Sequence, residues 1–340
     1  MKARVLVILA CLLTLSACAG PAPRTALVPL AEDQTPLSQA PLSSSGYAYY
    51  VIREDGTAVG WGDNIRCTLP ESCPTPDQAV AITGRAAGVY GGAWVALILD
   101  ENRDLWGLGA GGEPFCLLMD TPWDDPPQLV RLLENVVTAG SKGEYAMALL
   151  EDGTVVRWDS QGTRQFLTDC TALWVESMGG YALTEEGQLL GWGRQLPIAG
   201  MRDTLCQEPQ VILEDAKDLV SMACHQGVLC FLRSDGTLWR TGWDQDGGFL
   251  PPELWQQDVI ACMEHFYITS DHRLWTWELG SEPVVLMENA AAAMDGEQGI
   301  FALDRDGVLW HVDLDEARQP SPTRVMDGIR TPEHPVLRQQ

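Results

Sequence analysis

The segment VIREDGTAVGWG at residues 51–62 decides the fold, because its pattern returns six more times along the chain. In each copy an aliphatic residue stands four positions before a turn, and further residues, almost all apolar, stand three and five positions after it. Most turns carry an Asp-Gly or Glu-Gly pair, and Asp-Gly supplies the positive φ of a tight β-hairpin. The turn residues of the seven copies are Gly56, Arg103, Gly153, Gly187, Gly236, His272 and Gly307.

The two positions after the turn differ by two residues, so their side chains share one face of a strand and can be buried together. Three residues after the turn stand Val59, Trp106, Val156, Leu190, Trp239, Trp275 and Trp310. Five residues after it stand Trp61, Leu108, Trp158, Trp192, Thr241, Trp277 and Val312. Each copy is therefore predicted to be one two-stranded hairpin with a buried face.

A second apolar segment precedes every hairpin but the first, and PTRVMDGIR at 322–330 follows the last one. The turns at 56 and 307 are six repeats apart, about 42 residues each, as in propeller blades. An open solenoid would need polar caps, and the sequence shows none. We therefore predict an all-β, seven-bladed β-propeller over 46–330, closed by a C-terminal strand within 322–330 that completes the first blade, and a tail over 331–340.

The repeats resemble those of the RCC1 family, most clearly IREDGTAVGWGDN at 52–64 and ALTEEGQLLGWG at 182–193. The resemblance implies a seven-bladed propeller. It carries over no functional residue, because the glycine-rich segment of the family repeat is missing and its histidine is mostly replaced. Secreted bacterial propellers that are similar to this chain inhibit β-lactamases through an aromatic-rich end face, so the resemblance also implies protein binding, by analogy of fold alone.

The N-terminus resembles an export signal. Lys2 and Arg4 precede an apolar run over 5–17, which is too short to span a bilayer. The following Leu15-Ser16-Ala17-Cys18 resembles the lipobox of bacterial lipoproteins. We expect 1–17 to be a cleaved signal peptide, Cys18 to be lipidated, and the Pro- and Ser-rich 18–45 to be a tether. The alternative is a secretory peptide cut at Ala19 or Gly20.

The composition excludes one class of partner. The formal charge is -25, from 22 Lys and Arg against 47 Asp and Glu, whereas nucleic-acid binding depends on cations that neutralise phosphates. We therefore expect no nucleic-acid partner. An acidic surface also keeps a protein soluble, and we expect a monomer.

Ten cysteines become eight once Cys11 leaves with the signal and Cys18 is lipidated, and an even number outside the cytoplasm favours disulfides. The spacing favours the pairs Cys67–Cys73 and Cys224–Cys230, although Cys230 also fits a reduced thiol in the core. The cysteine and histidine spacings fit no zinc site, and Asp244-Gln245-Asp246 lacks the later ligands of an EF-hand. We expect no metal and no cofactor.

No catalytic motif occurs in the sequence. Only His225 and His265 are plausible site histidines, and both fit ordinary strand or loop positions. Four long connections follow the second hairpin strand, at 62–75, 109–125, 193–208 and 242–257, and should leave one end of the ring. The candidate partner-binding residues in them are Phe115, Trp123, Asp124, Trp243, Asp246, Phe249 and Trp255.

Aromatic side chains on such connections suit recognition, although they can also pack their own loops. We therefore expect an exported, membrane-anchored protein on the extracytoplasmic side of a bacterial cell that binds an unidentified protein or an envelope glycan. The alternative is a propeller enzyme, a lyase or hydrolase, with its site at the channel mouth. Titratable side chains with shifted pKa values converging on the axis would favour the enzyme, and loop aromatics around an uncharged mouth would favour binding.

Overall fold

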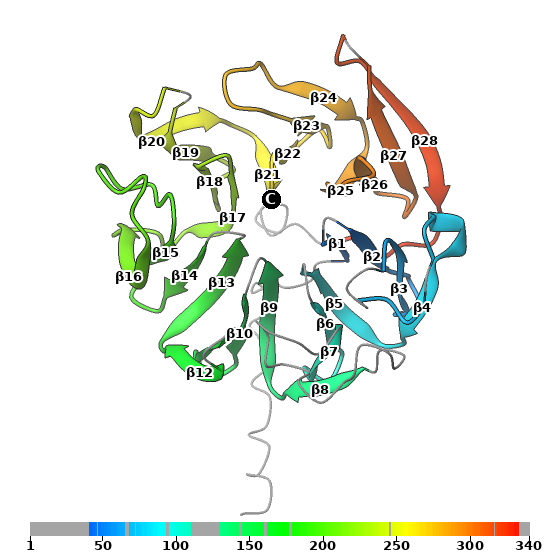
Figure 1. The fold of residues 1–340 in the computed structure, drawn as a ribbon. Coiled ribbons are helices and arrows are strands. Elements are labelled where there is room, and N and C mark those ends of the chain that lie inside the picture. Colours follow the sequence, from blue (N-terminus) through cyan, green and yellow to red (C-terminus); the bar gives the residue numbers. More distant parts are fainter. Residues whose placement is uncertain are drawn as a thin grey trace, which may run out of the picture. The chain divides into compact units, whose positions relative to one another are not determined.

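The computed structural model describes residues 41–45, 47–64, 68–71, 73–92, 95–109, 129–142, 145–159, 162–176, 179–244, 246–315 and 317–332. Seven four-stranded antiparallel sheets surround a common axis, which confirms the seven-bladed propeller (Figure 1). In each blade the strands follow one another in sequence from the axis to the rim. The only helix of the described residues is a 3-10 turn, Pro76–Gln78, and none of their helices is long and apolar enough to cross a membrane.

The strand bounds are as follows. Blade 1 contains β1 Leu42–Ser44, β2 Ala48–Ile52, β3 Ala58–Gly62 and β4 Val80–Thr83. Blade 2 contains β5 Ala86–Gly91, β6 Val95–Asp100, β7 Leu105–Gly109 and β8 Val130–Leu133. Blade 3 contains β9 Val136–Lys142, β10 Tyr145–Leu150, β11 Val155–Asp159 and β12 Gly162–Leu167. Blade 4 contains β13 Cys170–Glu176, β14 Gly179–Thr184, β15 Leu189–Gly193 and β16 Cys206–Leu213.

The remaining three blades have the same order. Blade 5 contains β17 Leu219–His225, β18 Val228–Arg233, β19 Leu238–Trp243 and β20 Phe249–Gln256. Blade 6 contains β21 Val259–Met263, β22 Phe266–Thr269, β23 Leu274–Thr276 and β24 Val284–Met287. Blade 7 contains β25 Ala290–Met294, β26 Ile300–Asp304, β27 Leu309–Leu314 and β28 Pro320–Met326.

The predicted hairpins are the two central strands of each blade. All seven turn residues have a left-handed φ, between 62° and 90°, which glycine adopts without strain and which Arg103 and His272 also adopt here. The aliphatic residue four positions before the turn pairs with the residue two positions after it, as Leu183 pairs with Leu189. That second position is fully buried in every blade, so it forms the centre of the apolar layer between blades.

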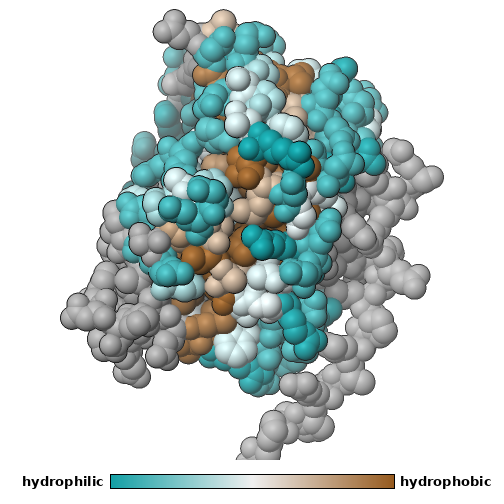
Figure 2. All heavy atoms as spheres, turned by 90° about the vertical axis from the view of Figure 1, so that its right-hand side faces the viewer, coloured by the Kyte–Doolittle hydropathy of each residue, from teal (hydrophilic) through white to brown (hydrophobic). Residues whose placement is uncertain are grey.

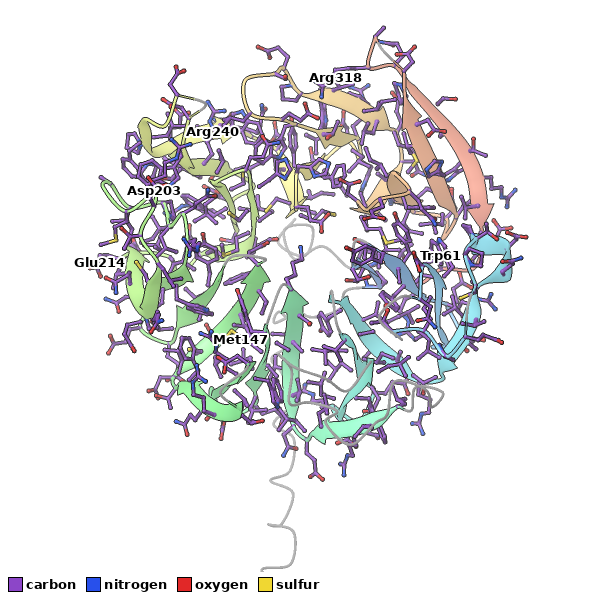
Figure 3. The ribbon with its side chains drawn as sticks, in the orientation of Figure 1. Trp61, Met147, Asp203, Glu214, Arg240 and Arg318 are labelled. Carbon is purple, nitrogen blue, oxygen red and sulfur yellow. The ribbon has the colours of Figure 1, made fainter. Side chains whose placement is uncertain are left out.

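Side chains fill the space between neighbouring sheets (Figure 3). Trp61 and Met147 are fully buried between blades, whereas Asp203, Glu214, Arg240 and Arg318 lie toward the rim. Because the blades bury their aliphatic residues against one another, the core is a ring of interblade layers rather than a single central cluster.

Each blade is bonded to the next by the same backbone link. The carbonyl of the turn residue Gly56 accepts a hydrogen bond from the N–H of Ala86, the first residue of blade 2, at 2.8 Å. In the same way the N–H groups of Val136, Cys170, Ala216, Val259, Ala290 and Ile329 donate to the carbonyls of Arg103, Gly153, Gly187, Gly236, His272 and Gly307, respectively. The last bond, 3.0 Å long, shows that Ile329 occupies the starting position of a blade.

Ring closure differs from the prediction. Most of 322–330 is the outer strand β28 of blade 7, so the C-terminal segment completes blade 1 only in part. Only its last residues reach blade 1, where Ile329 bridges Arg53. The rest of that innermost strand is β1, at 42–44. Those residues lie inside the predicted tether, so the propeller begins before residue 46.

The seam between blades 7 and 1 is apolar. Phe301 of blade 7 lies 4.8 Å from Tyr49 and 5.5 Å from Trp61, measured between ring centroids. Figure 2, which faces this side of the molecule, shows a band of apolar atoms bordered by hydrophilic ones. Burial of apolar area across this seam therefore adds to the backbone bonds that close the ring.

Candidate functional site

The innermost strands of all seven blades end at the same end of the channel. A cavity of about 380 Å³ opens there. Each blade supplies at least one lining residue from the end of its innermost strand or the loop after it: Ser44, Gly91, Lys142, Glu176, His225, Glu264 and Asp295. We call this cavity the channel mouth. The connections between third and fourth strands leave the same end of the ring, because the first and third strands of a blade run parallel.

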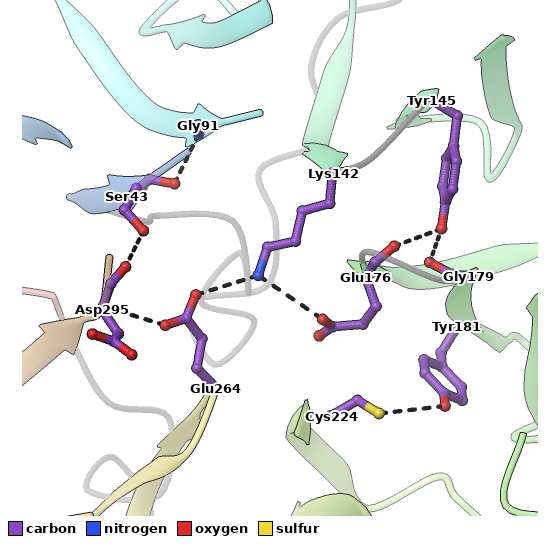
Figure 4. A network of polar contacts seen from close by, with 11 residues as sticks. Ser43, Gly91, Lys142, Tyr145, Glu176, Gly179, Tyr181, Cys224, Glu264 and Asp295 are labelled. Atoms are coloured by element: carbon purple, nitrogen blue, oxygen red, sulfur yellow. Dashed lines mark hydrogen bonds and ion pairs between the residues drawn. The ribbon is translucent and has the colours of Figure 1, made fainter. Parts of the chain in front are cut away.

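An ion-pair network crosses the mouth (Figure 4). Lys142 extends from β9 between two carboxylates of other blades. Its Nζ lies 3.2 Å from Glu264 Oε1 and 3.9 Å from Glu176 Oε2. The other Glu264 oxygen, Oε2, accepts the backbone N–H of Asp295 at 3.3 Å. One lysine thus links blades 3, 4 and 6, and Glu264 extends the network to blade 7.

Partial burial shifts the protonation of this network. Burial raises the pKa of Glu176 to about 7, because the opposing attraction of Lys142 is partly offset by Glu264. For Lys142 burial lowers the pKa, but attraction to Glu176 and Glu264 outweighs burial and leaves the pKa above its ordinary value. Lys142 is therefore charged near neutral pH, and Glu176 exchanges its proton there.

Two histidines form the neighbouring wall. The rings of His225 and His265 lie 4.7 Å apart between centroids, and His265 Nε2 lies 3.6 Å from Asp295 Oδ2. Burial is the largest cause that lowers the pKa of both histidines, and it raises the pKa of Asp295. Both histidines are therefore mainly neutral at pH 7, and each has one ring nitrogen available as an acceptor.

The mouth continues sideways between blades 4 and 5. A smaller cavity of about 80 Å³ shares Glu176, Cys224 and Gln226 with it and extends to Arg194. Cys224 contacts the Tyr181 hydroxyl at 4.0 Å, and burial raises the pKa of its thiol to about 12. Because thiolate is the nucleophilic form, Cys224 is not activated for attack.

Several predicted site residues lie outside the described residues, so their roles stay predictions: Cys18, Cys67, Phe115, Trp123 and Asp124. The disulfide predicted between Cys224 and Cys230 is wrong, because both cysteines are free. In the β17–β18 pair Cys230 faces Ala223, so the two thiols lie on opposite faces of the sheet. Cys73 is a free, buried thiol.

Two of the predicted loop tryptophans belong to strands instead. Trp243 ends β19, is 5% exposed, and donates its indole N–H to the Leu196 carbonyl at 3.2 Å. Phe249 begins β20 and packs edge-on against Trp243, with ring centroids 5.5 Å apart. Trp255, also in β20, packs edge-on against Trp277 at 5.2 Å. These aromatic side chains pack against neighbouring strands, which agrees with the alternative that they pack within the protein.

Asp244 and Asp246, the two aspartates that resemble the start of a calcium-binding loop, lie between Trp243 and Phe249. The Asp244 side chain accepts the N–H of Gly248 at 2.6 Å, so this carboxylate closes its own turn. Asp246 is exposed there. Among the described residues no group of three or more His, Cys, Asp or Glu side chains is placed to hold a metal ion.

Sequence reasoning passed over Lys142, Glu176, Glu264 and Asp295. A periodic signal was present: Lys142, Glu176 and His225 each stand eleven residues before their turn residue. That position ends the innermost strand of its blade, so it faces the axis in three successive blades. The polar residues at this one position of the repeat therefore indicated the mouth.

No sequence-family profile and no curated protein matches the chain. Solved structures do. Prp20p of Saccharomyces cerevisiae matches with a TM-score of 0.53 and 17% identity, over 84% of this chain and 76% of that chain. PorZ of Porphyromonas gingivalis, a surface component of the type-IX secretion system, has a TM-score of 0.54 and 12% identity, over 86% and 39%.

The CRINKLY ectodomain of the Arabidopsis thaliana receptor kinase ACR4 gives a TM-score of 0.52 and 12% identity, over 80% of this chain and 94% of that chain. At these identities the likeness shows the fold: the chain is an RCC1-like seven-bladed propeller.

Proposed function

We propose that the chain is a lipid-anchored, extracytoplasmic propeller that binds a partner protein across the face carrying the channel mouth. The observation that carries the proposal is the mouth itself, a polar cavity to which all seven blades contribute. A fold needs no charged cavity at its axis, and buried ionic groups cost free energy unless they are paired. The mouth therefore has the character of a recognition site.

The surrounding face supports the same function. The connection over 194–205 borders the smaller cavity beside the mouth through Arg194 and Gln195. Propellers of this fold serve as binding modules elsewhere, since Prp20p has binding properties to Gsp1p and histones. Protein recognition is the use that the combination of loops and a central cavity fits best.

The path of the chain is compatible with an anchor. Ile52, next to the first hairpin turn, donates its N–H to the Pro41 carbonyl at 2.8 Å. Pro41 therefore lies at the hairpin-turn end of the channel, opposite the mouth.

A second candidate function has its own observation. Glu176, with a pKa of about 7, can transfer a proton near neutral pH, and His265 and Asp295 line the same cavity. They would suit a lyase or hydrolase that uses general acid and base groups. Binding is favoured because Ser44 donates its hydroxyl to the Asp295 carbonyl and Cys224 holds its proton, so neither is an activated nucleophile.

Photocrosslinking in intact cells tests the proposal. A benzoylphenylalanine at Gln226, which lines both cavities, should crosslink to one protein. The same residue at Glu214, on the rim, is the matched control and should not. Crosslinking from both positions or from neither would contradict binding at the mouth. Separately, Cys18→Ser should move the protein to the soluble fraction, and retention in the membrane would disprove the lipid anchor.

A further inference from the structure

The ionisable side chains that line the mouth are unbalanced in charge. Lys142 is the only lysine or arginine among the described lining residues, against the carboxylates of Glu176, Glu264 and Asp295. The two histidines add little positive charge, because burial lowers their pKa. Burial raises the pKa of Glu176 and Asp295, and the attraction of Lys142 and of His265 offsets that rise only in part.

One wall of the mouth also holds two acceptors, Asp295 and His265, that a ligand can reach. His265 is 9% exposed and lines the cavity, with its ring facing the carboxylate of Asp295. The nearest carboxylate oxygen, Asp295 Oδ2, lies 3.6 Å from its Nε2, which is too long for a hydrogen bond. The other oxygen of Asp295 accepts only the N–H of the adjacent Gly296, at 2.8 Å. The Asp295 carboxylate, whose side chain is 39% exposed, can therefore accept a hydrogen bond from a ligand in the mouth.

The Lys142 amine does not satisfy this wall. It is held between Glu264 and Glu176, and the contacts of its Nζ are to those two carboxylates. Asp295 and His265 are therefore available to a donor from outside the chain. An anion would meet three carboxylates, and a neutral sugar hydroxyl would leave the negative charge uncompensated. A positively charged group with several N–H donors fits both requirements.

We propose that the mouth binds the guanidinium or primary ammonium group of a basic side chain, with Asp295 and His265 as its acceptors. This inference rests on the proposed function, because it assigns the mouth a ligand that a partner protein can insert. The cavity of about 380 Å³ is large enough for one such side chain. The His225 ring lies 4.7 Å from the His265 ring and lines the same cavity.

Isothermal titration calorimetry on the full chain in detergent tests the inference. The probe is N-acetyl-arginine amide, and N-acetyl-citrulline amide is its neutral counterpart of the same shape. We expect the arginine probe to bind at least tenfold more tightly than the citrulline probe. Asp295→Asn should weaken arginine binding at least fivefold, whereas the exposed control Asp313→Asn should leave it unchanged. The two-probe comparison uses the unaltered protein, so it does not depend on a variant folding.

The outcomes separate the inference from the proposed function. A Gly-Gly-Arg-Gly-Gly peptide that binds as well as the single residue supports a side chain presented by a protein. Binding of the single residue alone supports the same cationic chemistry with a free small molecule as its source. Equal binding of the arginine and citrulline probes, or no binding of either, overturns the inference. If the crosslink at Gln226 then still forms, protein binding stands and only the ligand class is wrong.

Discussion

Ile329 lies opposite Arg53 at the start of the innermost strand of blade 1, and Leu42 continues that strand from the other end of the chain. Between them the Arg330 N–H donates to the Ile52 carbonyl at 2.8 Å, and the Ile52 N–H donates to the Pro41 carbonyl at 2.8 Å. Arg330 and Pro41 are thus both hydrogen-bonded to Ile52. They occupy consecutive positions of one composite strand, which is built from two segments far apart in the sequence. Both ends of the propeller close the ring at its axis, and no single terminal strand completes a blade.

The first prediction concerns the packing of Ile329. Its side chain is fully buried within the core cluster of blades 7 and 1, so Ile329→Ala should destabilise the propeller by about 2–5 kcal/mol. Urea unfolding of the full chain measures this loss. The exposed Val211→Ala is the control and should change stability by less than about 0.5 kcal/mol. A similar midpoint for both variants would contradict closure through Ile329.

A circular permutant tests the composite strand directly. Because Arg330 and Pro41 occupy consecutive positions, joining them should give a continuous innermost strand, with new ends opened between the exposed Ala199 and Gly200. We expect this permutant to fold and to melt no lower than the parent chain, since the join removes chain entropy from the unfolded state. An otherwise equal permutant that lacks residues 329 and 330 should melt markedly lower. Equal melting of the two permutants would count against the composite strand.

The sequence pattern predicted the ring but misplaced its closure for a definable reason. Each apolar segment ahead of a hairpin contains two strands, the outer strand of one blade and the innermost strand of the next. A residue with left-handed φ separates them, such as Asn135, Asn289 and Gly328. In PTRVMDGIR the break at Gly328 assigns Val325 to blade 7 and Ile329 to blade 1. Where Asn or Asp takes the place of glycine at this position, the sequence does not mark the break between the two strands, because both residues tolerate the left-handed region.

The candidate site was less predictable. The tryptophans three residues after the turn are half-buried, and Trp106 and Trp310 donate their indole N–H to the side chains of Asp100 and Asp304. These tryptophans therefore indicate the packing of the hairpins and do not indicate a binding site. The mouth depends on side chains about 30 to 120 residues apart in sequence, such as Lys142 and Glu264, which only the ring brings together. No local spacing encodes that contact.

Gly180, which follows a residue lining the smaller cavity, gives a packing test. A Cβ built on Gly180 would lie 2.5 Å from Cζ2 of Trp192 and 2.9 Å from the Trp174 carbonyl oxygen. Gly180→Ala should therefore destabilise blade 4 by about 1–3 kcal/mol, because the indole and the backbone must move apart. Gly84→Ala, where a Cβ meets nothing within 4 Å, is the control. Thermal melting of the two variants compares them, and an undisturbed Gly180→Ala would mean that Trp192 has room to shift.

The last prediction follows from the proton on Glu176. Its carboxyl faces Lys142 from β9, Glu264 from the end of β21, and Cys224 from β17. Lys142 retains its charge through the neutral range, because its pKa is raised. His225 and His265 have lowered pKa values, so their contribution to stability is lost as the pH falls through their titration, opposite in sign to that of Glu176. Subtracting the profile of a Glu176→Gln variant from that of the parent chain isolates the carboxyl.

The folded pKa of Glu176, about 7, lies above its ordinary value of 4.5, so the folded state holds this proton more tightly than the unfolded chain does. Its contribution is therefore most favourable below pH 4.5 and is lost as the pH rises through 7, a difference of about 3 kcal/mol at full coupling. In urea titrations from pH 4.5 to pH 8, the stability of the parent chain relative to Glu176→Gln should fall steadily. At pH 8 the variant should be the more stable, because Gln carries no charge that burial penalises. A pH-independent difference would mean that Glu176 titrates as an ordinary exposed carboxyl.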